Sequence, residues 1–339
     1  MTAEFSREYI APLVRGQSLT RDEARTGLEM VLDGQIEAVQ IATFLTALTT
    51  KGESVDEMAG FVDAMMSRAL PADAPANCVD VVGTGGDQLH SVNVSSMAAF
   101  AVAGAGVPVA KHGNRSATSS VGSADVLEAL GIRLVLDAAT VRASIESSGF
   151  GFYYAPAFHP NLGTLAPIRR QLGFRTIFNV LGPLANPARV QHALIGVAQL
   201  KLLTPMAQVL LARGVQRVVM VRGDDGLDEL SLSGPSSLRI VTPEGVEETS
   251  IDASTELGLR YDADAMRGGD LTHNLDVFRR FLAGERGAVF DVVCANAGLA
   301  LVAANRANSL SEGFELASEA VLSGRASDVL DRAVAASNS

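Results

Sequence analysis

The sequence predicts an α/β protein with a small N-terminal all-helical domain and a larger domain in which helices flank a mainly parallel sheet. Two observations carry this prediction. The first seventy or so residues show only helical patterns, whereas the remainder alternates short β-branched runs with helical patterns, as parallel sheets covered by helices do. With 339 residues, 47% of them hydrophobic, the chain is long enough to give both domains a core.

The helical domain is predicted over residues 1–72 from capping signals and hydrophobic spacing. Thr20-x-x-Glu23 and Ser54-x-x-Glu57 are capping boxes, which mark helix N-termini, and Gly52 stands where the intervening helix should end. Apolar residues recur at i, i+3, i+4 and i+7. Because so small a domain buries these stripes only partly by itself, we expect it to form the contact of a homodimer. The stripes comprise Ile41, Phe44, Leu45, Leu48, Met58, Phe61, Val62 and Met65.

The α/β domain is predicted over residues 73–339, after a linker at Pro71–Pro75. Strand–helix alternation makes its sheet mainly parallel, and ligands of such sheets bind at the carboxyl ends of strands. We expect segment 163–190 to pack back on the helical domain. The expected strands are Val79–Val82, Val107–Val109, Arg133–Leu136, Leu194–Val197 and Arg217–Val221, with a hairpin over Leu238–Thr249 and helices over Ser123–Leu130 and Phe290–Ala304.

The most informative motif follows the first expected strand, where Val82 runs into Gly83-Thr84-Gly85-Gly86-Asp87. Glycines allow backbone N–H groups to approach a ligand closely, although a lone loop of this kind is as often a tight turn. The spacing matches neither the dinucleotide-binding nor the P-loop motif. Asn93-Val94-Ser95-Ser96 and Lys111-His112-Gly113-Asn114-Arg115 add an amide, hydroxyls and cations. Together these groups predict a site for a phosphorylated sugar.

An acidic cluster follows the strand expected to end at Val221, and it consists of Asp224, Asp225, Asp228 and Glu229. An isolated acidic loop is commonly a solvated turn. Beside a phosphate site, however, carboxylates usually imply Mg²⁺, which binds one or two carboxylates and the oxygens of its ligand. We therefore expect a Mg²⁺ site here, without deciding which of the four carboxylates hold the ion.

A third feature joins the arginines of Arg169–Thr176 to the Gly-Pro and Asn-Pro turns of Phe178–Pro187. Either part alone is uninformative, because arginines on helices are usually solvated and such dipeptides usually mark turns. A guanidinium beside a rigid turn suits recognition of a small planar carboxylate through two parallel hydrogen bonds.

Composition excludes several classes of protein. The net charge of −11 argues against a general nucleic-acid or membrane-surface binder, because phosphate backbones select basic surfaces. Cys78 and Cys294 lie singly in apolar runs, as reduced core thiols of a cytosolic protein do. The start of the chain shows no apolar signal segment, and the apolar run 97–110 is too short to span a bilayer. We expect a cytoplasmic protein.

These motifs, in this order, resemble one family, the anthranilate phosphoribosyltransferases, which join anthranilate to phosphoribosyl pyrophosphate in tryptophan biosynthesis. The resemblance runs from Thr20 to the terminal helices. It implies the fold shared by nucleoside phosphorylases and phosphoribosyltransferases, dependence on Mg²⁺, and a homodimer formed through the helical domains. The matching stretches are 83–87, 93–96, 111–115, 122–131, 169–187 and Asp228-Glu229.

The resemblance also implies roles for individual residues. The metal ligands would be Ser95, Asp228 and Glu229. Anthranilate would contact Gly83, Asn114 and Arg169, with His112 and Pro183 beside them. The phosphoribosyl pyrophosphate site would comprise Gly83, Gly86, Asp87, Ser91, Asn93, Val94, Ser95, Ser96, Lys111, His112, Gly113, Asn114, Arg115, Ser116, Ala117, Thr118, Ser119 and Ser123.

Two alternatives stay open at this point. A pyrimidine nucleoside phosphorylase would share the architecture and a lysine-containing phosphate loop, but the stretch 169–187 and Asp228-Glu229 favour the transferase. A non-catalytic relative that binds nucleic acid is disfavoured by the net charge of −11.

Overall fold

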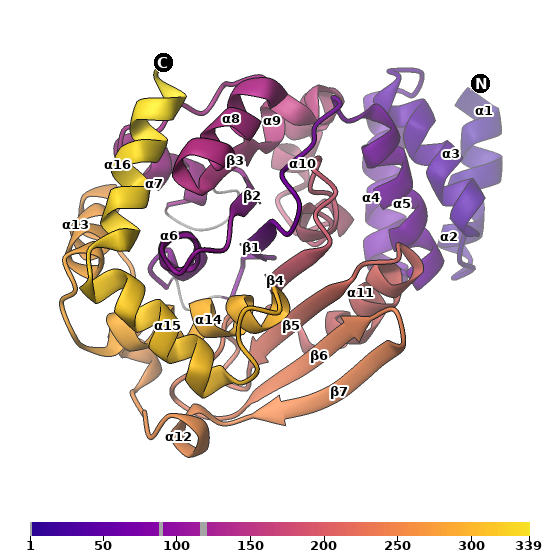
Figure 1. The fold of residues 1–339 in the computed structure, drawn as a ribbon. Helices are drawn as coiled ribbons and strands as arrows, with labels where there is room; N and C mark the ends of the chain where they lie inside the picture. Colours follow the sequence, from indigo (N-terminus) through magenta and orange to yellow (C-terminus); the bar gives the residue numbers. More distant parts are fainter. Residues whose placement is uncertain (1, 88–90, 116–120) are drawn as a thin grey trace. The chain divides into compact units, whose positions relative to one another are not determined.

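The computed structural model describes residues 2–87, 91–115 and 121–339 and divides the chain into two compact units (Figure 1). We call Met1–Pro71 with Ala155–Pro187 the helical unit, and Ala72–Tyr154 with Ala188–Ser339 the α/β unit. The sequence placed the first boundary after residue 72 and counted segment 163–190 in the α/β domain, with the expectation that it packs back on the helical domain. In the structure, the segment grouped with the first helices begins earlier, at Ala155.

The helical unit contains both predicted capping boxes. The side chain of Thr20 accepts a hydrogen bond from the backbone of Glu23, and that of Ser54 accepts one from the backbone of Glu57. Its first segment forms α1 (Thr2–Phe5), a π-helical turn (Ser6–Ile10), α2 (Ala11–Val14), α3 (Arg21–Leu32), α4 (Ala38–Lys51) and α5 (Val55–Arg68). Its second segment forms α9 (Ala155–Phe158), α10 (Ala166–Leu172) and the 3₁₀ turns Pro160–Leu165, Ile177–Asn179 and Gly182–Leu184.

Aromatic side chains link the two segments of the helical unit. Phe44 contacts Phe5 and Phe61 at ring-centroid distances of 5.4 and 5.8 Å, and Phe61 contacts Phe178 at 5.9 Å. Every apolar position of the two predicted stripes is buried within the single chain, so the expectation that this domain buries them only partly by itself is wrong. The second segment therefore joins this unit because Phe178 completes its core, which offsets the entropy of ordering an otherwise irregular stretch.

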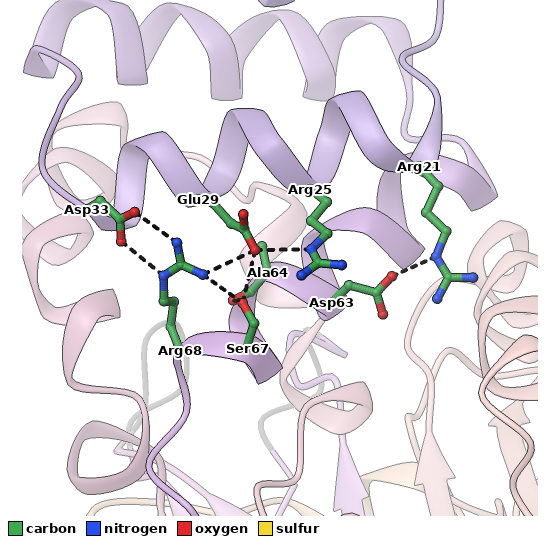
Figure 2. A network of polar contacts seen from close by, with 8 residues as sticks. All are labelled: Arg21, Arg25, Glu29, Asp33, Asp63, Ala64, Ser67 and Arg68. Carbon is green, nitrogen blue, oxygen red and sulfur yellow. Dashed lines mark hydrogen bonds and ion pairs between the residues drawn. The ribbon is translucent and has the colours of Figure 1, made fainter.

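Polar contacts join α3 to α5 across the surface of the helical unit (Figure 2). The two helices approach closely at Gly60, where a Cβ atom would lie 2.3 Å from the carbonyl oxygen of Arg21. The Arg21 side chain pairs with Asp63 at 2.6 Å, and Arg68 pairs with Asp33 at 2.8 Å. Each such pair is partly exposed and contributes only about 0–1 kcal/mol. The network thus sets the register of two helices that the core already holds together.

The α/β unit is built on one seven-stranded sheet of order β3-β2-β1-β4-β5-β6-β7. The pairs from β3 to β5 are parallel, and β6 and β7 join as an antiparallel hairpin. This confirms the predicted fold class and the predicted hairpin. The strands are β1 (Val79–Gly83), β2 (Val109–Gly113), β3 (Phe150–Tyr154), β4 (His192–Gly196), β5 (Arg217–Gly223), β6 (Ser236–Thr242) and β7 (Gly245–Ile251).

One predicted strand is wrong and one strand escaped prediction. Residues 133–136 form no strand, because the place beside β2 is taken by the aromatic run Phe150–Tyr154. The backbone N–H of Arg133 instead bonds the Ser337 hydroxyl at 3.1 Å. The strand expected over Val107–Val109 begins only at Val109 and continues to Gly113. As a result, the Lys-His-Gly motif lies inside a strand and not in a loop.

Helices cover the sheet of the α/β unit, and α14 lies at its centre, against β1, β4 and β5 (Figure 1). Every residue from Phe290 to Ala303 is buried. Cys78 and Cys294 are buried free thiols, as predicted. Among the described residues, no helix has the length and apolar character needed to cross a bilayer. The helices are α6 (Val94–Gly104), α7 (Ser123–Ala129), α8 (Ala138–Ser148), α11 (Leu200–Ala212), α12 (Ala253–Glu256), a 3₁₀ turn (Ala263–Met266), α13 (Leu271–Leu282), α14 (Ala288–Ala303), α15 (Leu310–Leu322) and α16 (Arg325–Ser337).

Candidate functional site

The candidate site lies at the carboxyl ends of β1 and β4, where the strand order of the sheet reverses. Gly83 and Gly196 are paired residues at these ends. A Cβ atom on Gly83 would lie 2.5 Å from Oδ2 of Asp228, and one on Gly196 would lie 1.6 Å from the Asp228 carbonyl oxygen. Both glycines are therefore required for the loop after β5 to cross the strand ends. The Gly85 backbone N–H donates to Asp228 Oδ2 at 2.7 Å, which joins the glycine loop to the acidic cluster.

The four predicted carboxylates of the acidic cluster divide into two kinds. Asp225 organises its own loop, because its Oδ2 accepts the hydroxyls of Ser231 and Ser233 at 2.5 Å each. Asp224 is exposed and lies 4.0 Å from an Arg222 nitrogen. These two carboxylates are accounted for by the turn and by solvent.

Asp228 and Glu229 are the buried pair, with 7% and 8% of their surfaces exposed. Burial and the neighbouring Asp228 carboxylate raise the pKa of Glu229 well above its ordinary value, while Lys111 and a hydrogen bond from the Ser95 backbone act in the opposite direction. Two adjacent buried acids resist carrying full charge together unless a cation arrives. Within the described chain no three His, Cys, Asp or Glu residues form a ready metal cage. Two carboxylates and a hydroxyl fit a hard divalent ion that takes its remaining ligands from a bound substrate.

Lys111 and His112 lie on β2 beside this pair and are almost wholly buried. The Lys111 ammonium donates to the carbonyl of Val81. Burial lowers the pKa of Lys111, and the carboxylates of Asp80 and Glu229 oppose that shift. The backbone N–H of His112 donates to Asp80 at 3.1 Å. Lys111 therefore supplies a positive charge below the strand ends, close to Glu229.

The end of β2 is shaped by another close approach. A Cβ atom on Gly113 would lie 2.6 Å from the Ser123 hydroxyl, which donates to the Asn114 carbonyl at 3.2 Å. The guanidinium of Arg115 pairs with Asp125 at 2.8 Å and Glu128 at 2.7 Å, and its pKa is raised by these bonds. The predicted residues Ser116, Ala117, Thr118 and Ser119 lie outside the described residues.

The loop before α6 carries Asp87, Ser91 and Asn93. The Ser91 hydroxyl donates to Asp87 at 3.2 Å. The Asn93 amide donates to the Val121 carbonyl at 3.2 Å and accepts from Asn274 at 3.1 Å. Val94, Ser95 and Ser96 open α6, whose first backbone N–H groups favour an anion at that end. Val94 and Ser96 are buried, and Ser95 is half-buried.

Arg169 and Pro183 belong to the helical unit and are described within it. Arg169 lies on α10, where its guanidinium carbon is 5.5 Å from the ring centroid of Phe178, and burial lowers its pKa. No ion pair to Arg169 is found among the described residues. Pro183 is buried in the turn Gly182–Leu184. Stacking on Phe178 therefore orients the Arg169 guanidinium without removing its positive charge.

Sequence reasoning missed two buried asparagines that hold the site loops. Asn274 on α13 bonds Asn93, and Asn296 on α14 bonds the backbone of Leu230, next to Glu229. For Asn296 the available signal was an amide inside a mainly apolar helical run, because an amide in a core needs hydrogen-bond partners. Asn274 lies in a polar, amphipathic helix and gave no such signal.

Comparison with known proteins identifies the family of the chain. Residues 75–327 match the glycosyl transferase family a/b domain, and residues 7–69 match the helical bundle domain of the same family. The anthranilate phosphoribosyltransferase of Thermomicrobium roseum is 47% identical over 332 residues, covering 96% of this chain and 95% of that protein. The chain belongs to the anthranilate phosphoribosyltransferase family.

Other members of the anthranilate phosphoribosyltransferase family are similar over equal lengths. The enzyme named so in Nocardioides sp. is 48% identical and covers 97% of this chain and 98% of its own. The crystal structure of the Thermus thermophilus enzyme has a TM-score of 0.90 at 39% identity, covering 98% of this chain and all of that one. A Saccharomyces cerevisiae structure in complex with PRPP and Mg shares the fold, with a TM-score of 0.90 at 24% identity over 100% of this chain and 99% of that one.

Proposed function

We propose that the protein transfers the phosphoribosyl group of 5-phosphoribosyl 1-pyrophosphate to the amine of anthranilate, giving N-(5-phosphoribosyl)anthranilate and pyrophosphate, as a cytoplasmic step of tryptophan biosynthesis. The observation that carries the proposal is the buried Asp228–Glu229 pair against the glycine loop, in a chain 47% identical to an anthranilate phosphoribosyltransferase.

The phosphoribosyl pyrophosphate site is proposed along the edge formed by the glycine loop, the start of α6 and the end of β2. Gly85 and Gly86 have positive φ values of 64° and 77°, a conformation that glycine adopts without strain and that allows the backbone to approach a ligand closely. The start of α6 adds the positive end of the helix dipole and the Ser95 and Ser96 hydroxyls. Lys111 contributes positive charge from below. These groups suit a pyrophosphate and a ribose phosphate.

The cofactor proposed is Mg²⁺, held by Asp228, Glu229 and the Ser95 hydroxyl. The pKa of Glu229 is raised by burial and by the neighbouring Asp228 carboxylate. A bound divalent ion would offset both effects, because its charge stabilises the two ionised carboxylates. When bound, Mg²⁺ supplies positive charge that makes pyrophosphate a better leaving group. Gly83 and Gly196 let Asp228 lie close to the strand ends.

The chemistry assigned to the chain is electrostatic stabilisation and positioning. Donors of the glycine loop offset charge on the departing pyrophosphate while C1′ gains oxocarbenium character. In the helical unit, Arg169 is proposed to hold the anthranilate carboxylate, with Pro183 as a further contact. In the α/β unit, Gly83, Asn114 and His112 are the proposed anthranilate contacts. In-line attack by the amine then inverts C1′. An arylamine carries its lone pair at neutral pH, so no general base is needed before the bond forms.

The direct test is the loss of anthranilate fluorescence on mixing protein, phosphoribosyl pyrophosphate and Mg²⁺. We expect loss that requires all three components, with pyrophosphate released in equal amount. An inactive preparation that binds neither substrate would contradict the proposal. Phosphorolysis of thymidine under the same conditions would instead favour a pyrimidine nucleoside phosphorylase.

We further propose a homodimer formed through the helical unit. Val14 and Val39 are 70% and 67% exposed on this unit, so part of its apolar surface is left uncovered. Light scattering at micromolar concentration should give about twice the chain mass of 35.3 kDa. A clean monomer at that concentration would rule the proposal out.

A further inference from the structure

The loop from Gly223 to Ser233 is fixed at several points along its length. The Gly223 backbone N–H donates to the Leu227 carbonyl at 3.0 Å, and Asp225 closes the turn. Leu227, Leu230 and Leu232 are buried in the hydrophobic core. Asp228 and Glu229 therefore lie between anchored leucines, and their position depends on where the backbone of Leu230 is held.

Asn296 holds that backbone from both sides. Its Oδ1 accepts the Leu230 N–H at 2.8 Å, and its Nδ2 donates to the Leu230 carbonyl at 3.2 Å. A third bond from Nδ2 reaches the Val292 carbonyl of its own helix at 2.9 Å. The amide is fully buried, with 0% exposure, and it has three partners.

Burying the Asn296 amide costs free energy of folding unless its polar atoms are hydrogen-bonded. α14 is buried from Phe290 to Ala303, and Asp291 and Asn296 are the polar side chains in that run. A buried amide that loses its partners destabilises the fold. The two bonds to Leu230 mimic the pairing of a neighbouring strand, in a loop that has left the sheet. They fix the residue that directly follows Glu229.

We propose that Asn296 is a positioning residue that sets the distance and orientation of the Asp228–Glu229 carboxylates for the divalent ion. It touches neither the ion nor the substrates, and it acts through the Leu230 backbone. This inference rests on the function proposed above. Groups that orient metal-binding carboxylates typically change metal affinity roughly ten- to a hundredfold when they are removed.

The experiment compares Asn296→Ala with Leu301→Ala, a control on the same helix. Leu301 is also fully buried, and its side chain belongs to the hydrophobic core. Both variants should lower the melting temperature. Only Asn296→Ala should raise the Mg²⁺ concentration for half-maximal rate, by roughly ten- to a hundredfold, with activity regained in excess Mg²⁺.

A second readout does not depend on turnover. The rise in melting temperature caused by phosphoribosyl pyrophosphate is measured as a function of Mg²⁺ concentration. The Mg²⁺ concentration at half of the full rise should increase in Asn296→Ala and should remain at the wild-type value in Leu301→Ala. If Asn296→Ala does not fold, Asn296→Ser is used, which replaces the amide by a shorter hydroxyl able to donate or accept one hydrogen bond and should give a smaller shift of the same sign.

Equal Mg²⁺ midpoints in the Asn296 and Leu301 variants would overturn the role of Asn296 while leaving the proposed function intact. A wild-type protein whose melting temperature ignores phosphoribosyl pyrophosphate and Mg²⁺, and which consumes no anthranilate, would overturn the proposed function itself.

Discussion

Each unit of this protein buries a glutamate beside a lysine, and the two sites differ in what surrounds the carboxylate. In the helical unit, Glu57 is fully buried and pairs with Lys51 at 2.8 Å. Its oxygens also accept the backbone N–H groups of Leu19 at 2.9 Å and Ser54 at 2.8 Å. Cation and donors together match the charge and lone pairs of this carboxylate, so Glu57 ties two helices and a loop into one fold.

In the α/β unit, Glu229 is buried near Lys111 but also beside Asp228. The pKa of Glu229 is therefore raised, which indicates that the surrounding groups do not fully offset the charge of its carboxylate. The comparison teaches that burial alone does not separate structural from functional acids. What separates them is whether the donors and cations present already balance the charge, because an unbalanced pair attracts a further cation.

The strongest test of this contrast is the double variant Asp228→Asn with Glu229→Gln. We expect turnover to be nearly abolished even in saturating Mg²⁺, because the proposed metal ligands lose their charge. Thermal stability should be equal or higher, since the repulsion between neighbouring acids is removed. Turnover and melting temperature are measured on the same preparation. Full activity of the double variant would contradict the metal assignment.

Glu57→Gln should show the opposite pattern. It leaves the Lys51 ammonium buried without its counter-charge, which typically costs about 3–5 kcal/mol of unfolding free energy. The Mg²⁺ dependence of the remaining folded enzyme should not change. Denaturant unfolding measures the first quantity and the fluorescence assay the second.

The matched control for that experiment is Glu23→Gln, at the same capping-box position but on the surface. It should cost less than about 1 kcal/mol. A Glu57→Gln protein as stable as the Glu23→Gln protein would show that the buried Lys51–Glu57 pair contributes little to the stability of the fold.

Arg169 is the expected exception within the helical unit, a half-buried cation with a substrate role. Arg169→Ala should raise the KM for anthranilate by roughly thirty- to a thousandfold, equivalent to about 2–4 kcal/mol, and leave the KM for phosphoribosyl pyrophosphate nearly unchanged. Arg169→Lys should recover little, because an ammonium cannot form two parallel bonds to a carboxylate. Asn114→Ala, which removes a neutral contact, should cost about 1 kcal/mol.

Two outcomes would change the assignment of Arg169. Values of KM within about twofold of wild type for both substrates would limit Arg169 to its packing on Phe178. Equal weakening toward both substrates would place it on the phosphate side of the site.

The smallest effect expected concerns pH and the helical unit. His159 is buried, its Nε2 lies 2.9 Å from the Ala185 carbonyl oxygen, and burial lowers its pKa from the ordinary 6.5. Below pH 6.5 the unfolded chain takes up a proton that the folded protein resists, so stability should fall as the solution becomes more acid. His159→Gln should weaken this dependence, whereas His273→Gln, at an exposed position, should not. The test compares the melting temperatures of the wild type and both variants at about pH 5.5 and about pH 7.5, one below and one above the ordinary histidine pKa.

Several features of the site followed from local pattern. Both capping boxes and both apolar stripes formed where the sequence predicted them, since these signals act over one or two helical turns. Gly83 was expected at the end of a strand, where a loop could meet a ligand, and β1 ends there. The hairpin of β6 and β7 turns at the predicted residues because Pro243 and Gly245 favour that turn.

Strand choice was decided by competition between distant segments. Residues 133–136 and Phe150–Tyr154 are both compatible with a strand, but only one can pair with β2, and the aromatic run has the larger apolar area to bury. A local pattern cannot rank two candidates for the same edge, because the ranking depends on packing against residues elsewhere in the chain.

By itself, the sequence determined the fold class, the helix starts, the glycine loop and an acidic loop that belongs near phosphates. Only the tertiary structure decided which carboxylates matter, because the Gly85–Asp228 bond spans 143 positions and the Asn296–Leu230 bond spans 66. Asp225 and Asp228 are close together in the sequence, yet Asp225 closes a turn, whereas Asp228 packs against Gly83 and Gly196. Their difference comes from burial and from partners brought near by folding, and these are absent from any short window of residues.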